Sequence, residues 1–471
     1  MSAFIAPAVL VPVLCLPVAA CAGGTEAISV VQPARQFTTA ERYEANPGGA
    51  GSLATRRFDR PAASLPAAQR MTFTLGEALF EKLWVPAPSS TRASDGLGPL
   101  FNARACANCH PGNGRGRPED GQGISGMVLK LSRRYRAEDG AFGVEGWHGM
   151  IPDYDFGWQL QDRAVPSLQP EGRLELEWIE AHGLRYPAPR IDLPPEVLTS
   201  LRVAPQIIGL GLLEAIPEAD ILMHADPEDA DGDGISGRAQ YAPGPDGAVR
   251  LGRFGHKAGM ARLVDMTAQA FSQDMGLSSV LFAEGSGDCT LTQTDCLELP
   301  DGIDVGLRDN AEVSTEALQA VTDYVTWLGV PKRRDVADPQ VLRGKQAFYQ
   351  AQCHACHVPK FVTATSEDPV TSHQLIWPYS DLLLHDMGEG LADHRPEGVA
   401  SGHEWRTAPL WGIGLTQENT GHAPRFLHDG RAATLDEAIR WHGGEAGAAR
   451  DRYLALPAAS RADLIRFLET L

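Results

Sequence analysis

Two five-residue motifs of the same type, C-x-x-C-H, lie at residues 106–110 and 353–357. In each motif, two thiols three positions apart sit on one helical turn, where both can add to the vinyl groups of one porphyrin. The histidine that follows can then bind the iron. A zinc site or a redox-active cysteine pair is the alternative, but neither explains a histidine after both pairs. We therefore predict two covalently bound haem c groups, held by Cys106, Cys109 and His110 and by Cys353, Cys356 and His357.

The first 22 residues contain no Asp, Glu, Lys or Arg and are rich in Ala, Val, Leu and Pro. This stretch is too short and too rich in proline for a spanning helix, and it is typical of a signal peptide, although its start lacks the usual Lys or Arg. Val18 to Cys21 matches a lipobox, in which Cys21 would be acylated; cleavage after residues 20–22, giving soluble export, is the alternative. We expect a periplasmic lipoprotein held at the membrane by its lipid anchor.

The composition and net charge of the chain exclude some classes of binding partner. The chain has 471 residues, a formal net charge of −19 and no long basic run, which argues against nucleic acid as a partner. An acidic surface is compatible with docking a basic redox partner. Two cysteines outside the leader and the motifs, Cys289 and Cys296, predict a disulfide in an oxidising compartment, with two free thiols as the alternative.

A repeat of two helices around each motif sets the expected fold. Gly76 to Phe80 and Gly344 to Phe348 share the pattern G-x-x-[Leu/Ala]-Phe at helical spacing, within a first helix predicted over residues 74–83. A second helix is predicted at the end of each half, with its apolar face at 318–328 in the first half and at 464–471 in the second. Ser460 and Asp463 form a predicted capping box for the last helix. We expect a mainly α fold of two cytochrome c-like haem domains, the first with a long loop-rich insertion over about 110–310 that contains short strands, one of them near residues 174–179. The expected divisions are a leader (1–22), a tether (23–66), a first haem domain (67–334) and a second (335–471).

Three carboxylates at alternate positions, Asp229, Asp231 and Asp233, precede Gly234. This is the first half of a calcium-binding loop, in which the glycine permits a sharp turn. The twelfth position is Gln240 rather than the bidentate glutamate of an EF-hand, so other residues must complete the ligand set. An acidic turn without an ion is the alternative to calcium.

Several further motifs together make the chain resemble the bacterial di-haem oxidoreductases, a family named for peroxidase activity and sometimes called thiol oxidoreductases. These enzymes are related to the di-haem cytochrome c peroxidases and to the di-haem enzyme of methylamine utilisation. The resemblance covers nearly all of the mature chain. It rests on residues 98–104, 114–116, 205–217, 231–238, 379–388, 404–410, 426–431 and 434–444.

The resemblance implies two haems with different roles. One iron keeps an open position for an oxidant, while the other is closed by a second protein ligand and relays electrons. His442 occupies the place from which the related enzymes close the second iron, so it is the expected sixth ligand; Met387 is the runner-up, and a surface or capping histidine is the third reading. For the first iron the sequence does not choose among Met71, His148, Met150 and His182.

The resemblance also suggests an acid–base pair. Glu214, with Gln206 as a positioning amide, is similar to the Gln/Glu pair of the related enzymes, although the spacing differs; a glutamate that caps or pairs within a buried helix is the equal alternative. The relatives have tryptophan where this chain has His256, between Arg253-Phe254-Gly255 and Lys257. That histidine could ligate, shuttle protons or face solvent.

These observations predict an exported di-haem c-type oxidoreductase that reduces hydrogen peroxide, with electrons from a periplasmic donor protein entering at the second haem. A pure electron carrier with both irons closed, and an oxygenase that attacks a bulky hydrocarbon, are the alternatives.

Overall fold

The computed structural model describes residues 41, 43–121, 125–135, 150–303, 306 and 308–471. Helices account for 31% of the chain and strands for 16%, so helix exceeds strand, as predicted, although long irregular connections separate the elements. In the described part, none of the helices combines the length and the apolar character needed to cross a bilayer. The expected leader, and His148, lie outside the described residues.

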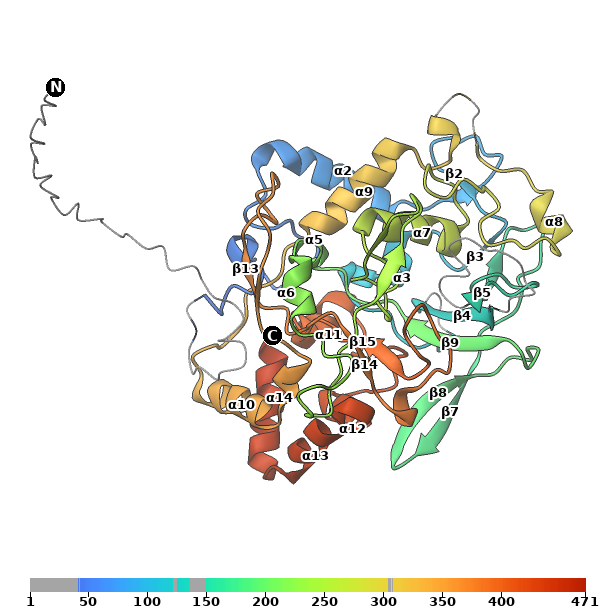
Figure 1. The fold of residues 1–471 in the computed structure, drawn as a ribbon. Coiled ribbons are helices and arrows are strands. Elements are labelled where there is room, and N and C mark those ends of the chain that lie inside the picture. The colour runs from blue at the N-terminus through green and yellow to red at the C-terminus, as the bar shows by residue number, and fades with distance from the viewer. Residues whose placement is uncertain (1–40, 42, 122–124, 136–149, 304–305, 307) are drawn as a thin grey trace, which may run out of the picture.

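The first haem motif lies beside two crossed helices, α2 (Arg70–Glu81) and α9 (Thr315–Trp327), which pack on each other near the top of Figure 1. The motif itself forms the short helix α3 (Cys106–Cys109). Helix α2 begins four residues before the predicted start, because Phe73 lies on the same buried face as Gly76 and Phe80 and extends the apolar stripe by one turn.

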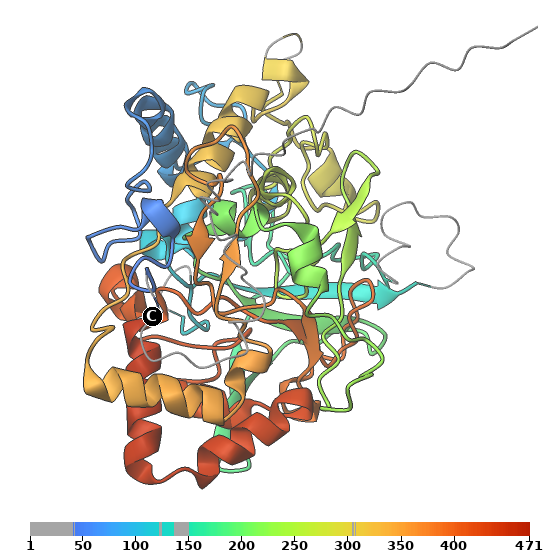
Figure 2. The same ribbon diagram turned by 60° about the vertical axis from the view of Figure 1, so that its left-hand side comes forward.

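The second motif, whose first turn is a 3₁₀ helix (Cys353–Ala355), follows the helix α10 (Pro339–Gln350). Helix α10 packs against the last helix, α14 (Ala458–Thr470), and Figure 2 shows the two crossing. The predicted capping box of α14 is wrong: the helix starts two residues before Ser460, and Asp463 instead forms an ion pair with Arg343 at 2.8 Å.

Both helix pairs cross at a glycine of the repeated sequence pattern. A Cβ atom on Gly76 would lie 2.1 Å from the backbone oxygen of Ala320 in α9. A Cβ atom on Gly344 would lie 1.9 Å from the backbone oxygen of Asp463 in α14. The pattern therefore repeats because two backbones must approach closely at each crossing, which only glycine allows.

The region between the first motif and α9 contains the predicted short strands. A three-stranded antiparallel sheet has the order β5-β4-β9, and the hairpin β7–β8 projects beside it, at the lower right of Figure 1. The predicted strand near 174–179 is β7, which begins two residues later. The strands of this region are β4 (Met127–Arg134), β5 (Met150–Ile151), β6 (Arg163–Ala164), β7 (Leu176–Ala181), β8 (Leu184–Pro189), β9 (Leu198–Val203), β10 (Tyr241–Pro243) and β11 (Val249–Leu251). Three shorter strands precede the first motif: β1 (Val85–Pro86), β2 (Asp95–Leu97) and β3 (Leu100–Phe101).

The expectation of only strands and loops in this region is incomplete, because it also contains helices. The longest, α7 (Leu263–Met275), packs against α9 and buries Ala268, Phe271 and Met275 in the main core. Its apolar residues are interrupted by Gln and Ser, which weakens the helical periodicity in the sequence. The shorter helices are α5 (Leu210–Glu214), α6 (Glu218–Leu222) and α8 (Thr294–Leu297).

A disulfide joins Cys289 to Cys296, with Cα atoms 6.2 Å apart, which confirms the predicted pairing and excludes the two free thiols. After α10, the second half of the chain adds small elements that surround its motif. They are β12 (Phe361–Val362), β13 (Leu375–Ile376), β14 (Leu384–Asp386), β15 (Glu404–Arg406), α11 (Thr416–Thr420), α12 (Leu435–Trp441) and α13 (Gly447–Ala455).

Residues 43–66 were expected to be part of a tether, but they belong to the folded body. Leu53, Phe58 and Leu65 are buried in the core. The buried carboxylate of Glu44 forms ion pairs with Arg333 and Lys345. The segment buries several apolar side chains and one paired carboxylate, so it packs despite its glycine and proline content.

Candidate haem sites

Three histidines share one hydrogen-bonding arrangement. Nδ1 of His110 lies 2.8 Å from the backbone oxygen of Pro205, and Nδ1 of His357 lies 2.9 Å from that of Tyr379. Nδ1 of His442 lies 2.7 Å from the backbone oxygen of Ala438. Because a carbonyl oxygen can only accept, each Nδ1 carries the proton and each Nε2 remains available to a metal.

The protonation of these histidines suits metal ligation. Burial lowers the pKa of His110 and of His442 below the usual value. Burial also lowers the pKa of His357, to about 4, and the nearby His442 contributes to the shift. All three imidazoles are therefore neutral near pH 7, which is the form that binds iron.

One cavity of about 480 Å³ contains the complete second motif together with His442 and Met387. It therefore offers two cysteine sulfurs and two imidazoles, and its walls include the apolar side chains of Leu435, Ile439, Leu464 and Leu468. This donor set fits a covalently attached haem, which Cys353 and Cys356 would hold and whose iron His357 and His442 would bind. Met387 lines the same cavity, so it remains the alternative to His442.

The cysteines of the two motifs form no disulfide. Burial raises the pKa of the Cys106 and Cys353 thiols to about 12, so they are uncharged until a covalent bond is made. Among the described residues, no potential metal-binding cluster combines cysteines of both motifs, as one zinc site would require. These observations favour haem attachment over the zinc and redox alternatives.

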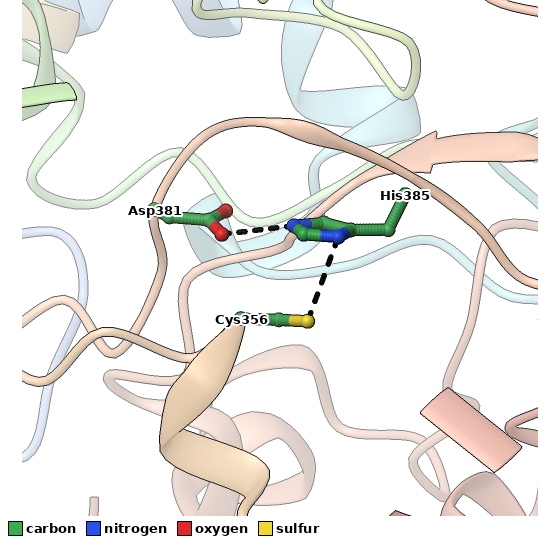
Figure 3. Close-up of side chains that lie close together, drawn as sticks. All are labelled: Cys356, Asp381 and His385. Carbon is green, nitrogen blue, oxygen red and sulfur yellow. Dashed lines mark hydrogen bonds and ion pairs between the residues drawn. The ribbon is translucent and has the colours of Figure 1, made fainter. Parts of the chain in front are cut away.

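A charged cluster adjoins the second motif (Figure 3). Nε2 of His385 lies 2.8 Å from the Asp381 carboxylate, and its Nδ1 lies 2.7 Å from Glu445 and 3.6 Å from the Cys356 sulfur. Burial opposes the charged form of this imidazole, but Asp381 and the other partners raise its pKa well above the usual value. Because both nitrogens are already bonded to carboxylates, the cluster supplies an imidazolium beside Cys356 rather than a metal site.

The first motif is enclosed by α2 and by the loop after residue 125. The Phe80 ring lies 6.3 Å from the His110 ring, and a Cβ atom on Gly126 would lie 2.5 Å from the backbone oxygen of Cys109. Burial raises the pKa of Cys109 above the usual range of a thiol. The motif is therefore held between two chain segments that are distant in sequence.

Two of the three described candidates for the sixth ligand of the first haem lie at the surface. Met71 is 79% exposed, and His182 is exposed at the turn of the hairpin β7–β8. Met150 is buried, but its sulfur accepts a hydrogen bond from the Ser132 hydroxyl at 3.2 Å.

Glu214 and Gln206, the suggested acid–base pair, bond to different partners and not to each other. The Glu214 carboxylate accepts the backbone N–H of Leu263 at 2.9 Å and so caps the start of α7. Gln206 lines the second-haem cavity, and its amide donates to the backbone oxygen of Trp411. Burial raises the pKa of Glu214, as a base in a low-dielectric site would need, but its hydrogen bond favours the capping alternative.

His256 lines the second-haem cavity rather than facing bulk solvent. Its ring lies edge-on to Trp405, with centroids 6.4 Å apart, and Trp405 stacks on His428 at 3.7 Å. No role was predicted for Trp405 or His428 from the sequence, although both belong to motifs typical of the family. Their proximity to His256 arises from β15 and from the loop before α12, and no local signal predicts it.

The acidic loop brings together Asp226, Asp229 and Asp231 rather than the predicted set with Asp233. Its carboxylates accept backbone N–H groups of the loop itself; Asp226, for example, binds the N–H of Ala230 at 2.9 Å. Gln240 is buried and binds the segment at 397–399, away from the loop. Calcium at Asp229, Asp231 and Asp233 stays a prediction, with Asp226 as an additional candidate.

Comparison with known proteins agrees with the geometry of these sites. The family model described as "Di-haem oxidoreductase, putative peroxidase" matches residues 49–126 and 192–471. No curated protein matches. Among solved structures, hydrazine synthase from Kuenenia stuttgartiensis, studied under xenon pressure, is 20% identical over 34% of this chain and 57% of that chain, with a TM-score of 0.24, which is too low to support an argument. The family match covers most of the chain, so this protein belongs to the di-haem oxidoreductases.

Proposed function

We propose that this protein is an exported di-haem c-type oxidoreductase that reduces hydrogen peroxide at its first haem with electrons that arrive at the second. The observation that carries the proposal is the inequality of the two sites. The second cavity offers two neutral imidazoles, His357 and His442. At the first motif, among the described residues, one imidazole, that of His110, has this arrangement.

Bound haem would supply the redox chemistry, with an accessible iron at the first site and a closed iron at the second. The protein's part is to orient the ligands. The carbonyls of Pro205, Tyr379 and Ala438 fix the histidine tautomers and make each Nε2 a better donor. His442, when it binds, excludes oxidants from the second site.

The two sites adjoin through one short segment. Pro205, whose carbonyl orients His110, also lines the cavity of the second motif, next to Gln206. The same cavity wall contains His256, Trp405 and His428. We infer that this aromatic wall separates the two haems and takes the place of the tryptophan found in related enzymes.

Several predictions from the sequence belong to this proposal. The helix pairs α2–α9 and α10–α14 support two cytochrome c-like units. We also propose a periplasmic location, a lipid anchor at Cys21 and a periplasmic donor protein.

For the acidic loop we propose a calcium ion. Chelation with EGTA should then lower the melting temperature by a few degrees, because a ligand that binds only the folded state stabilises it. Restoring Ca²⁺ should reverse the change, and Asp229→Asn should remove the response. An unchanged melting temperature on chelation would support the alternative interpretation, in which the loop is an acidic turn that binds no ion.

The spin states of the two irons test the main proposal. Electron paramagnetic resonance of the oxidised protein should show one high-spin and one low-spin ferric signal, and peroxide should be consumed with a reduced donor. Two low-spin signals without peroxide turnover would instead favour an electron carrier. One observation favours the electron carrier as a second candidate function. Glu214, the residue expected to act as the catalytic base, already accepts a hydrogen bond that caps α7.

A further inference from the structure

A half-open groove of about 790 Å³ carries the opposite charge to the molecule as a whole. The formal net charge of the chain is −19, yet the groove is lined by more arginines than carboxylates. Its walls come from residues 117–120, the hairpin β7–β8, residues 422–425 and the outer side of α12. The charged lining residues are Arg117, Arg185, Arg425, Arg431 and Arg440, opposed by Glu119, Asp120 and Glu437.

Each carboxylate that lines the groove has an ion-pair or hydrogen-bond partner close to it in the sequence. Asp120 forms an ion pair with Arg117, Glu119 accepts the backbone N–H of Gly121 at 2.6 Å, and Glu437 accepts that of Ala433 at 2.7 Å. The lining holds five arginines against three carboxylates. Arg431 and Arg440 also pair with Asp429 at 2.7 Å and with Asp436 at 4.0 Å, both outside the lining.

Two of the arginines are available to an incoming anion. Within the described parts of the chain, Arg185 and Arg425 form no ion pair with a carboxylate. Their guanidinium groups lie over the ring of Trp178, at 5.6 and 5.4 Å from its centroid. An aromatic surface holds a guanidinium in place without neutralising it, so the charge is oriented and remains open to a carboxylate.

The groove is separated from the second-haem cavity by thin segments of chain. Helix α12 presents Glu437 and Arg440 to the groove, while Ala438 and, directly after the helix, His442 line the cavity. Two other segments also have one residue on each side of the partition. Arg425 lines the groove and Leu427 the cavity, and Arg117 lines the groove and Arg115 the cavity.

A packed aromatic route crosses this partition. Arg431 lines the groove, and its guanidinium lies 4.7 Å from the centroid of Trp441. Tyr186, next to Arg185 on β8, packs edge-on against Trp441 at 6.1 Å. Trp441 is covalently joined to His442, the proposed ligand of the second iron.

We propose that this groove is the electron-entry site, where a carboxylate-rich face of an acidic donor protein docks and delivers electrons through Trp441 and His442. The inference rests on the proposed function only for the identity of the second haem as the electron acceptor. The hairpin that supplies Trp178 and Arg185 lies within residues 127–191, which the family model does not match. Selection of the donor is therefore a property of this chain's own insertion.

Electron exchange with two small probes of opposite charge tests the proposal on the full-length haem-loaded protein. The reduced protein is mixed with the anionic Fe(III)–EDTA complex or the cationic hexaammineruthenium(III) ion, and oxidation of the second haem is followed by its absorbance. Each event transfers one electron from the haem iron to the probe metal, with no bond made or broken. The double variant Arg185→Gln with Arg425→Gln should slow exchange with the anion about tenfold at low salt and leave the cation within about twofold, because local charge steers association.

Binding provides a second readout that does not depend on electron transfer. Hexaglutamate should bind the unaltered protein in calorimetry at low salt, more weakly as salt rises, and weakly or not at all to the double variant. The matched control is Arg190→Gln, an exposed arginine that directly follows β8 but lies outside the groove lining, which should change neither readout.

Equal loss in the control, or unchanged anion exchange and hexaglutamate binding in the double variant, would overturn the groove as the entry site. This result is independent of the peroxidase proposal, which is decided by spin state and peroxide turnover. If the protein has no high-spin iron but shows the expected probe selectivity, the peroxidase proposal fails. The groove then remains the docking site of an electron carrier.

Discussion

The bond from each Nδ1 to a backbone carbonyl decides what His110, His357 and His442 can do. It leaves one nitrogen for a metal and fixes the plane of the ring. His442 is also the C-cap of α12, because its Nδ1 bonds the Ala438 carbonyl in the last turn of that helix, so the capping interpretation is met. Its place in the cavity of the second motif keeps the ligand interpretation beside the capping one.

Replacing His442 with alanine should convert one haem from low spin to high spin and leave the other unchanged, because only one iron loses a ligand. Optical and electron paramagnetic resonance spectra of the oxidised protein measure this. Met387→Leu is the matched control, since Met387 lines the same cavity and should have no effect. If Met387→Leu changes the spectrum and His442→Ala does not, the assignments are reversed.

Glu312 should make stability depend on pH. Its buried carboxyl binds the N–H and hydroxyl of Ser278, and burial raises its pKa to about 7 from an ordinary value of 4.5. A raised folded-state pKa gives stability that is complete below about pH 4.5 and is lost as the pH rises through about 7, for a total of about 3 kcal/mol.

Denaturant unfolding between pH 5 and pH 8 measures this effect. Glu312→Gln, which cannot titrate, should flatten the dependence over that range. A variant with the same pH profile as the unaltered protein would show that another group is responsible.

At the scale of elements, the repeated glycines explain why two distant segments share a pattern. Helices α2 and α9 cross at Gly76, and α10 and α14 cross at Gly344, each with backbone against backbone. The sequence predicted the helices and their pairing order from apolar spacing. It did not predict the close crossings, because the partner backbone belongs to a segment more than a hundred residues away.

Adding a methyl group at either crossing should force the helices apart. We expect Gly76→Ala and Gly344→Ala each to cost about 1–3 kcal/mol, as overpacking does. The control is Gly447→Ala at the start of α13, where a Cβ atom would meet no atom closer than 3.9 Å. Thermal unfolding compares the three variants, and equal stability of all three would contradict the crossing argument.

At the scale of the whole molecule, the N-terminal segment is tied to the second half by buried charges. Glu44 is only 4% exposed and binds Arg333, Lys345 at 2.9 Å and the Tyr379 hydroxyl at 3.2 Å. Burial raises the pKa of Glu44, but the two cations more than compensate and hold it below the usual value. Because the Tyr379 carbonyl orients His357, this network also supports the second haem site.

Glu44→Gln should destabilise the protein by about 3–5 kcal/mol, because it leaves the buried Arg333 without its counter-charge and Lys345 with Glu41 alone, at 3.6 Å. Asp335→Asn, which removes an exposed ion pair with Arg466, should cost less than about 1 kcal/mol. Chemical unfolding of both variants measures the difference. Similar small losses would mean that the buried network contributes little to stability.

The sequence by itself determined the two candidate haem-binding motifs, since C-x-x-C-H is a local pattern that one helical turn forms without help from distant residues. It also determined the disulfide, because Cys289 and Cys296 lie seven positions apart in one loop. Tertiary structure decided the rest. It moved Glu214 to the cap of α7, placed His385 between two carboxylates beside Cys356, and packed residues 43–66 into the core. The cationic groove on an acidic molecule is a further example, because its charge comes from four segments that only the fold brings together, whereas net charge is a sum that ignores position.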